Sequence, residues 1–266
     1  MTRQGLLHLG SDQSPALRSV LFSLRDPLAL ASSKLQPAEI LGILNQVEAG
    51  FRGPNNQKKG VPKYYPSQEL VQELTRTLHS SFSNVTEMPG SVHVAVDTLQ
   101  CARHKCWGAW NLSCLRAVSV TILSLVHSKM DVTVSYFTNE GVAFIEVSTS
   151  DSVTSLVEKL REVSKSGGRV RPEAVLRSDR EAGRAKDLVL CVTASDIVQQ
   201  EAKEEVWAEL LQARVNEEKV KFLYWALSSK HLEDPVKNPN FSNMLDLYGW
   251  SPDSTRIIQA FARDFF

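Results

Sequence analysis

The chain has 266 residues, and its 30 Lys and Arg residues balance its 30 Asp and Glu residues, so the formal net charge is zero. This balance excludes a whole-molecule electrostatic attraction to nucleic acid or anionic lipid and confines any such contact to a local patch. Hydrophobic residues make up 42% of the chain and charged residues 23%, which is ordinary for a globular protein and excludes overall disorder. The length allows one large domain or two small ones.

Location is indicated by three features of the sequence. No stretch approaches the roughly 18 uninterrupted apolar residues that a membrane-spanning helix needs. The first residues, MTRQGLLHLGSDQ, lack the apolar segment and the cleavage site of a secretory signal. The 4 cysteines are too few for a disulfide scaffold in a chain of this length and fit a reducing compartment. We expect a cytoplasmic protein, with the nucleus as the alternative, and no membrane partner.

Residues 1–50 are predicted to be an N-terminal helical segment. Apolar residues recur at helical spacing from Pro15 in PALRSVLFSL. A second run, PAEILGILNQVEAGF, begins at Pro37, and proline is favoured in the first turn of a helix. We interpret the two runs as a short helical pair.

A basic loop and a connecting helix are predicted for residues 51–90. Residues 50–68 hold four basic side chains and no acidic one, and two tyrosines stand near their end. Such a loop can hold phosphates and stack an unpaired base. The candidate RNA contacts are Arg52, Lys58, Lys59, Lys63, Tyr64 and Tyr65. A second, weaker basic segment lies at 165–187, and a solvated surface without a ligand is the alternative for both.

From residue 91 to residue 266, short β-rich runs alternate with longer helical ones. The predicted strands are SVHVAVD (91–97), DVTVSYF (131–137), VAFIEV (142–147), DLVLCVT (187–193) and VKFLYWAL (220–227). The predicted helices span 111–127, 151–165, 201–218 and 253–266, and Asp151 and Asp253 are candidate N-caps. This alternation predicts an α/β fold with a doubly wound, mostly parallel sheet, to which the 131–147 pair adds one antiparallel edge strand.

Several of these segments carry a resemblance. They are LQPAEIL from Leu35, SVHVAVD, the Gly167–Gly168 turn and, most specifically, NPNFSNMLDLYGWSPDSTRIIQAFARDF from Asn238. Together they resemble the carboxyl-terminal part of the Ro autoantigen (TROVE) family of RNA-binding proteins, with its Rossmann-like von Willebrand factor A domain. In that family a ring of helical repeats precedes the A domain and holds RNA, and only something like its last helical pair is present here. The resemblance implies a non-enzymatic ribonucleoprotein component that binds small non-coding or structured RNA directly or through a partner.

The same resemblance locates a metal-ion-dependent adhesion site, which in A domains offers oxygen ligands to Mg²⁺ from five positions. Carried over onto this chain, Asp97 remains. The other four positions hold Leu99, Cys101, Arg169 and Ala194. We therefore predict a degenerate, metal-free pocket without a cofactor, closed by an ion pair between Arg169 and Asp97. In the alternatives, Thr98, Ser195 and Asp196 rebuild the site in a shifted register, or Asp97 simply caps the next turn.

Two further chemistries were weighed for the residues after the first strand. The cluster Cys101, His104, Cys106 and Cys114 contains zinc-ligand types, but its spacing matches no established zinc pattern. Cys101 with His104 as its base could form a nucleophile, but no orienting group or oxyanion hole is identifiable. We prefer unliganded thiols and no catalysis.

Trp107 and Trp110 support a second function hypothesis. Two tryptophans three residues apart in an otherwise polar loop form an apolar contact surface if they are exposed, whereas burial against the sheet is the ordinary outcome. The alternative function is therefore a metal-independent protein interaction module built on a degenerate A domain. A protein partner is expected under either hypothesis, and the sequence carries no indication of an oligomeric state.

Overall fold

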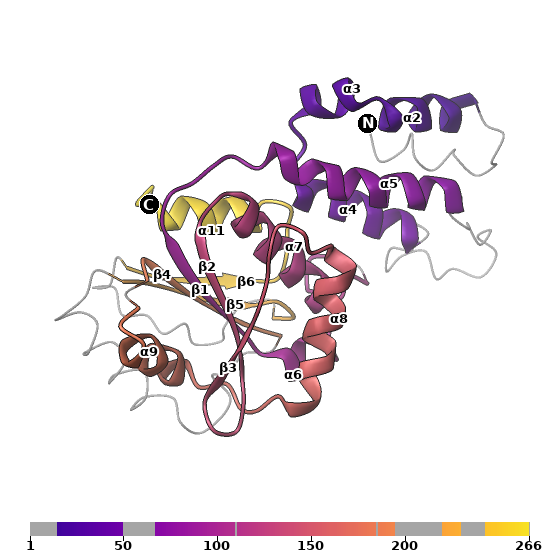
Figure 1. The fold of residues 1–266 in the computed structure, drawn as a ribbon. Coiled ribbons are helices and arrows are strands. Elements are labelled where there is room, and N and C mark those ends of the chain that lie inside the picture. The colour runs from indigo at the N-terminus through magenta and orange to yellow at the C-terminus, as the bar shows by residue number, and fades with distance from the viewer. Residues whose placement is uncertain are drawn as a thin grey trace. The chain divides into compact units, whose positions relative to one another are not determined.

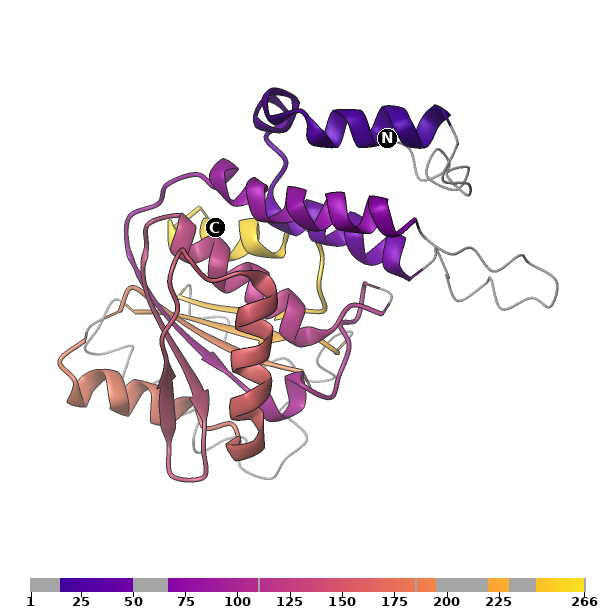
Figure 2. The same cartoon turned by 45° about the vertical axis from the view of Figure 1, so that its right-hand side comes forward.

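The computed structural model describes residues 15–49, 67–109, 111–184, 186–194, 220–229 and 243–265. The chain divides into two units, Met1–Thr86 and Glu87–Phe266, which are taken in turn (Figure 1 and Figure 2). None of the helices in these described parts has the length and apolar composition needed to span a bilayer.

The described part of the first unit is helical. It contains α2 (Pro15–Arg25), α3 (Pro27–Ser33), α4 (Pro37–Glu48), α5 (Gln68–Ser80) and the short 3-10 helix η1 (Ser81–Asn84). The helices predicted from Pro15 and Pro37 are confirmed, whereas α3 was not predicted. Its N-cap is Asp26, whose Oδ1 accepts a hydrogen bond from the Leu28 N–H at 2.9 Å. The buried leucine and isoleucine side chains of the longer helices are Leu17, Leu21, Ile40, Leu41, Leu44, Leu70, Leu74 and Leu78.

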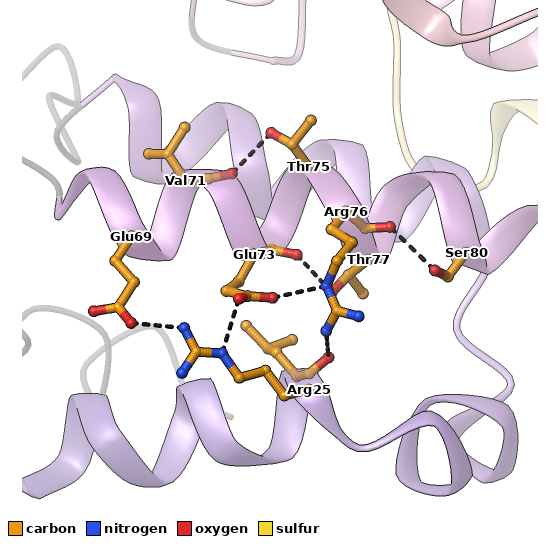
Figure 3. Close-up of polar contacts among 9 residues, drawn as sticks. Arg25, Glu69, Val71, Glu73, Thr75, Arg76, Thr77 and Ser80 are labelled. Carbon is orange, nitrogen blue, oxygen red and sulfur yellow. Dashed lines mark hydrogen bonds and ion pairs between the residues drawn. The ribbon is translucent and has the colours of Figure 1, made fainter.

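Ion pairs join α2 to α5 on the surface of this unit (Figure 3). Arg25 extends toward α5, where its Nη2 lies 2.6 Å from Glu69 Oε1 and its Nε lies 2.8 Å from Glu73 Oε1. Arg76 shares Glu73, with Nε 2.9 Å from Oε2. The hydrogen bond from Arg25 lowers the pKa of Glu73 and keeps it ionised. Exposed pairs of this kind contribute little stability.

The second unit is built on a six-stranded sheet. Its strands are β1 (Ser91–Val96), β2 (Asp131–Phe137), β3 (Val142–Ile145), β4 (Leu188–Thr193), β5 (Lys221–Ala226) and β6 (Met244–Tyr248), in the order β3-β2-β1-β4-β5-β6. All neighbours are parallel except β2 and β3, which are antiparallel at one edge. The predicted fold class is confirmed, and β6 is the strand that was not predicted.

Helices cover both faces of this sheet. On one face, Val175 and Leu176 of α9 (Pro172–Glu181) pack in a core with strand residues, which are Ala95, Phe137, Val189, Cys191, Phe222, Tyr224 and Ala226. The helices α7 (Cys114–His127), α8 (Val153–Val163) and α11 (Ser254–Ala262) lie on the other side (Figure 1 and Figure 2). Because side chains alternate along a strand, odd-numbered positions of β1 and β2 face α9 and even-numbered ones face α7. The helix predicted at 201–218 lies outside the described residues.

Of the two predicted helix caps, Asp151 is wrong, and Asp253 holds the N-cap position without a capping bond. The cap of α8 is Ser152, whose Oγ accepts from the Ser155 N–H at 3.0 Å, and not Asp151. Asp151 instead accepts from the Ser148 N–H at 2.9 Å and pairs with Lys159 at 2.7 Å. Asp253 occupies the N-cap position of α11, but its side chain makes no capping hydrogen bond. A nearby lysine or a serine one residue later competes with an aspartate for these roles, and residue type alone does not decide between them.

Candidate functional site

The candidate site lies at the edge of the sheet where its parallel strands end. Ligands of doubly wound sheets bind at this edge, so it is where chemistry is sought first. The chain passes from β1 through Asp97 directly into the short helix α6 (Thr98–Cys101). The Asp97 N–H donates to the Val192 carbonyl of β4 at 2.8 Å, so the strand pairing continues up to the site.

Asp97 is a structural cap. Its side chain is only 3% exposed. Its Oδ1 accepts from the Gln100 N–H at 3.0 Å, and its Oδ2 accepts from the Thr193 hydroxyl at 2.9 Å. Burial raises the pKa of Asp97, and the hydrogen bonds from Gln100 and Thr193 offset this only in part. Both oxygens are therefore occupied by protein donors, as expected if Asp97 caps the next turn.

The predicted ion pair between Arg169 and Asp97 is wrong. Arg169 is exposed, whereas Asp97 is buried and bonded to other groups. The turn before Arg169 is held elsewhere, because the Gly168 N–H donates to the Phe137 carbonyl at 2.8 Å. A Cβ on Gly168 would lie 2.2 Å from the Thr138 backbone carbon, so this turn is pressed against the end of β2 and accepts only glycine. The path of the backbone thus directs Arg169 into solvent.

Leu99, Cys101 and Ala194, at three of the positions carried over from the resemblance, offer no ligand oxygen. A Cβ on Gly167 would lie 3.1 Å from Leu99 Cβ, so the glycine turn packs against α6 at this residue. Cys101 and Ala194 are fully buried. The Thr98 hydroxyl is buried without a hydrogen-bond partner among the described residues. Ser195 and Asp196, which the alternative site would need, lie outside the described residues.

These residues do not fit Mg²⁺. A hard divalent cation needs several oxygen ligands that are free to face it, and most of the carried-over positions offer none. Within the described parts of the chain, no group of three or more His, Cys, Asp or Glu side chains is arranged to hold a metal ion. The same holds for the zinc cluster considered from the sequence. Of its members, Cys106 and Cys114 lie together with their Sγ atoms 3.9 Å apart, while His104 is exposed and bonded to the Gln100 carbonyl at 2.9 Å.

A nucleophilic role for Cys101 is disfavoured by its surroundings. The side chain is fully buried. Burial raises the pKa of the Cys101 thiol well above its ordinary value, so the reactive thiolate is suppressed.

The loop after α6 presents one of the two candidate tryptophans to solvent. Trp107 is 46% exposed, and Trp110 lies outside the described residues. The backbone of Trp107 is fixed, because its N–H donates to the Leu227 carbonyl and its carbonyl accepts from the Trp250 N–H, each at 2.8 Å. Leu227 follows β5 and Trp250 follows β6. The loop is thus fastened across the strand ends and displays the Trp107 ring on a fixed backbone.

The structure describes most of the basic segment 165–187 but none of the candidate RNA contacts in the basic loop. The candidate RNA contacts Arg52, Lys58, Lys59, Lys63, Tyr64 and Tyr65 all lie outside the described residues. The segment 165–187 contains α9 and does not form a uniform basic surface. Lys186 is buried and pairs with Asp131 at 2.7 Å, and Arg184 lies over the Phe144 ring, 5.5 Å from its centroid.

A buried polar relay escaped the sequence analysis. His93 of β1 bridges two elements, with Nδ1 2.7 Å from Asp179 Oδ1 of α9 and Nε2 2.7 Å from Ser135 Oγ of β2. The order of acid, imidazole and hydroxyl is that of hydrolase triads, but all three residues are buried, and a nucleophile must be accessible to its substrate. The relay therefore fastens α9 to the sheet. The signal in the sequence was a histidine at a core-facing position of an apolar strand.

Of the comparisons with known proteins, the one with solved structures found a match. No protein-family model matches the sequence, and no curated protein matches it. The structure is similar to the crystal structure of the RO (RSR) protein of Deinococcus radiodurans, with a TM-score of 0.76 and 19% sequence identity. The predicted resemblance is confirmed as a likeness of fold. The match covers 98% of this chain and 52% of the other, so the chain spans about half the length of the Ro protein that it resembles.

Proposed function

We propose that this chain is a non-enzymatic, Ro-like ribonucleoprotein component that binds small structured RNA directly or through a protein partner. The observation that carries the proposal is the likeness of fold to a Ro protein over 98% of the chain, at a TM-score of 0.76. The segment from Asn238, which resembles the Ro family most specifically, supports it from the sequence. Its β6 and α11 complete the sheet and one helical layer of the second unit.

Direct contact with RNA is assigned to the basic loop at 50–68. The chain as a whole is neutral, so it lacks a general attraction to phosphates, and a local patch must supply the attraction. In this loop four positive charges stand without a negative one, followed by two tyrosines that can stack on unpaired bases.

The salt dependence of RNA binding tests the direct mode. For single-stranded RNA, log affinity falls with log salt concentration with a slope of about −0.7 per phosphate contact. Neutralising Lys58, Lys59 and Lys63 together should weaken binding and reduce that slope by about two units. The matched control neutralises three exposed basic residues of the second unit, Lys129, Arg256 and Arg263. It should leave the slope nearly unchanged.

Either of two results removes the direct mode. The first is no binding of structured RNA by the folded wild-type chain at low salt. The second is an equal loss of affinity in the loop variant and in the control variant. Co-purification with RNA that depends on a second protein would then support the indirect mode, and its absence would count against the ribonucleoprotein proposal as a whole.

A metal-independent protein interaction module is the second candidate. It is favoured by Trp107, which stays 46% exposed although its backbone is fixed at both N–H and carbonyl. We expect a bound partner protein to be retained in the presence of a chelator, lost on Trp107→Ala, and kept on Phe265→Ala, since Phe265 is also exposed but lies at the end of the chain. Retention that requires Mg²⁺ would contradict this candidate.

A further inference from the structure

Two thiols meet beneath the Trp107 loop. Cys106 precedes Trp107, and Cys114 is the first residue of α7. Their Sγ atoms are 3.9 Å apart, and both cysteines are free thiols. The Cys106 N–H donates to the Leu112 carbonyl at 2.8 Å, and the Cys114 N–H donates to the His104 carbonyl at 3.2 Å. The loop is therefore folded back on itself in a way that holds the sulfurs together.

The surroundings of the two sulfurs make them chemically unequal. The hydrogen bond from the Cys106 thiol lowers the pKa of Cys114 against the opposing effect of burial. The N-terminus of α7 also favours a negative charge at this position. The same hydrogen bond and burial raise the pKa of Cys106. Cys114 is thus the sulfur that forms a thiolate, and Cys106 is the proton donor beside it.

The other two cysteines provide a contrast inside the same unit. Cys101 is fully buried, and its pKa is raised well above the ordinary value. Cys191 is buried in the core between the sheet and α9. Cys114 is fully buried as well, but its partner Cys106 keeps 7% of its surface exposed and is preceded by exposed loop residues, so a small peroxide can reach the pair only from the Cys106 side.

We propose that Cys106 and Cys114 are a redox-active dithiol, which hydrogen peroxide or a similar small peroxide oxidises to an intramolecular disulfide. A disulfide needs the sulfurs about 2.05 Å apart, so the two side chains must approach each other from 3.9 Å. The bond would close a ring around residues 107–113 and attach the Trp107 loop covalently to α7. The proposal does not depend on RNA binding, because it concerns only the second unit.

The chemistry balances in two steps. The Cys114 thiolate attacks one oxygen of the peroxide, the O–O bond breaks, and the departing hydroxide takes up a proton and leaves as water. The Cys106 sulfur then attacks the resulting sulfenic acid at Cys114, the S–O bond breaks, and the hydroxyl leaves as a second water with the proton of the Cys106 thiol. The two sulfurs together lose two electrons, and the peroxide gains them. A dithiol reductant reverses the reaction by thiol–disulfide exchange.

The chain is well arranged for a direct test. Trypsin cleaves after Lys105 and Arg116, so Cys106 and Cys114 fall in one peptide, while Cys101 and Cys191 fall in others. The full, reduced chain is treated with hydrogen peroxide under native conditions, then denatured, alkylated and digested. We expect the 106–116 peptide to lose both alkyl tags and two hydrogens, and to regain both tags after dithiothreitol. The peptides with Cys101 and Cys191 should keep their tags.

Variants separate the roles of the two sulfurs. Cys106→Ser should leave a sulfenic acid at Cys114 that dimedone traps, whereas Cys114→Ser should leave Cys106 as an unreacted thiol. Cys191→Ser is the control and should form the disulfide normally. The proposal is overturned if the wild-type 106–116 peptide keeps both tags, or if Cys101 or Cys191 is oxidised first. The wild-type measurement decides even where a variant fails to fold.

Discussion

Asp97 and Asp179 are both buried in the second unit, at 3% and 4% exposure, yet they do different work. Asp97 bonds close to its own position, to the amide three residues on and to the end of the neighbouring strand. Asp179 reaches from a helix to His93 in the sheet, and its Oδ2 has no hydrogen-bond partner in the described part of the chain. The first organises a turn, and the second joins two layers.

The two aspartates show how burial limits what polar residues of the second unit can do. The strand-end Asp97 lies at the edge of the sheet where ligands of doubly wound sheets bind, but both of its oxygens accept hydrogen bonds from the protein. The buried relay uses residue types that hydrolases use for catalysis, but its burial leaves it only a structural role. In both cases the residue types suggest metal binding or catalysis, but the side chains are buried and are not accessible to a ligand or substrate.

The largest expected effect comes from breaking the relay. Asp179→Ala leaves the His93 Nδ1 buried without its partner, and such a loss costs about 2 to 3 kcal/mol. We expect the free energy of unfolding, measured in urea by circular dichroism, to fall by that amount. Glu181→Ala, an exposed position at the end of the same helix, is the control and should change it by less than about 0.5 kcal/mol. Equal effects of the two substitutions would show that Asp179 does not join the layers.

A smaller effect is expected at Asp97. Asp97→Ala removes the cap of α6 and leaves the Thr193 hydroxyl unpaired, at a combined cost of about 1.5 kcal/mol. Asp253→Ala is the matched control, since Asp253 holds the N-cap position of α11 without a capping bond. It should cost less than about 0.5 kcal/mol in the same urea titration. A larger loss of unfolding free energy for Asp97→Ala than for Asp179→Ala would contradict the expected order of the two effects.

The pH dependence of stability tests whether the pKa of Asp97 is raised in the folded chain. Its pKa is raised in the folded chain, so above the ordinary carboxyl value of about 3.9 the folded state still holds a proton that the unfolded state has lost. Stability linked to this group is therefore greatest at low pH and falls as pH rises through the raised value. The wild type should lose stability relative to Asp97→Asn as the pH rises above the ordinary carboxyl value of about 3.9. A difference that is flat with pH, or rises, would contradict a raised pKa.

Mg²⁺ should have the smallest effect of all. Because both oxygens of Asp97 accept hydrogen bonds from the protein and Leu99, Cys101 and Ala194 offer no ligand oxygen, millimolar Mg²⁺ should leave the melting temperature of the wild type unchanged. A saturable rise in melting temperature that Asp97→Ala abolishes would mean that a cation site has been rebuilt at the strand ends. The same titration on Asp179→Ala serves as the control for a general effect of the salt.

The sheet was predictable because its strands are apolar runs with β-branched residues bounded by turns. β1, β2 and β4 were located to within one residue, and the antiparallel edge followed from the turn at 138–141. β6 was missed because it is short and half-buried, with Asp246 at its centre. α9 was missed because its many charged residues suggested a basic connection.

The candidate site was predictable in its residue types but not in its contacts. The loss of ligand oxygens at Leu99, Cys101 and Ala194 can be read from the sequence. The direction of Arg169 cannot, because it follows from the close approach of Gly168 to the end of β2. The meeting of His93 with Asp179, and that of Cys106 with Cys114 apart from Cys101, likewise depend on the chain path.

The joint between the Trp107 loop and the end of β6 also bears on how the unit folds. Gly108 and Gly249 both have positive φ, at +88° and +64°, and a Cβ on either would lie 2.7 Å from an atom of Trp250 or Trp107. The two glycines are far apart in the sequence, so this joint can close only when β6 has reached the edge of the sheet. A contact of such long range forms only at the cost of the entropy of the intervening chain. The Trp107 loop therefore reaches its final position only after this joint has closed.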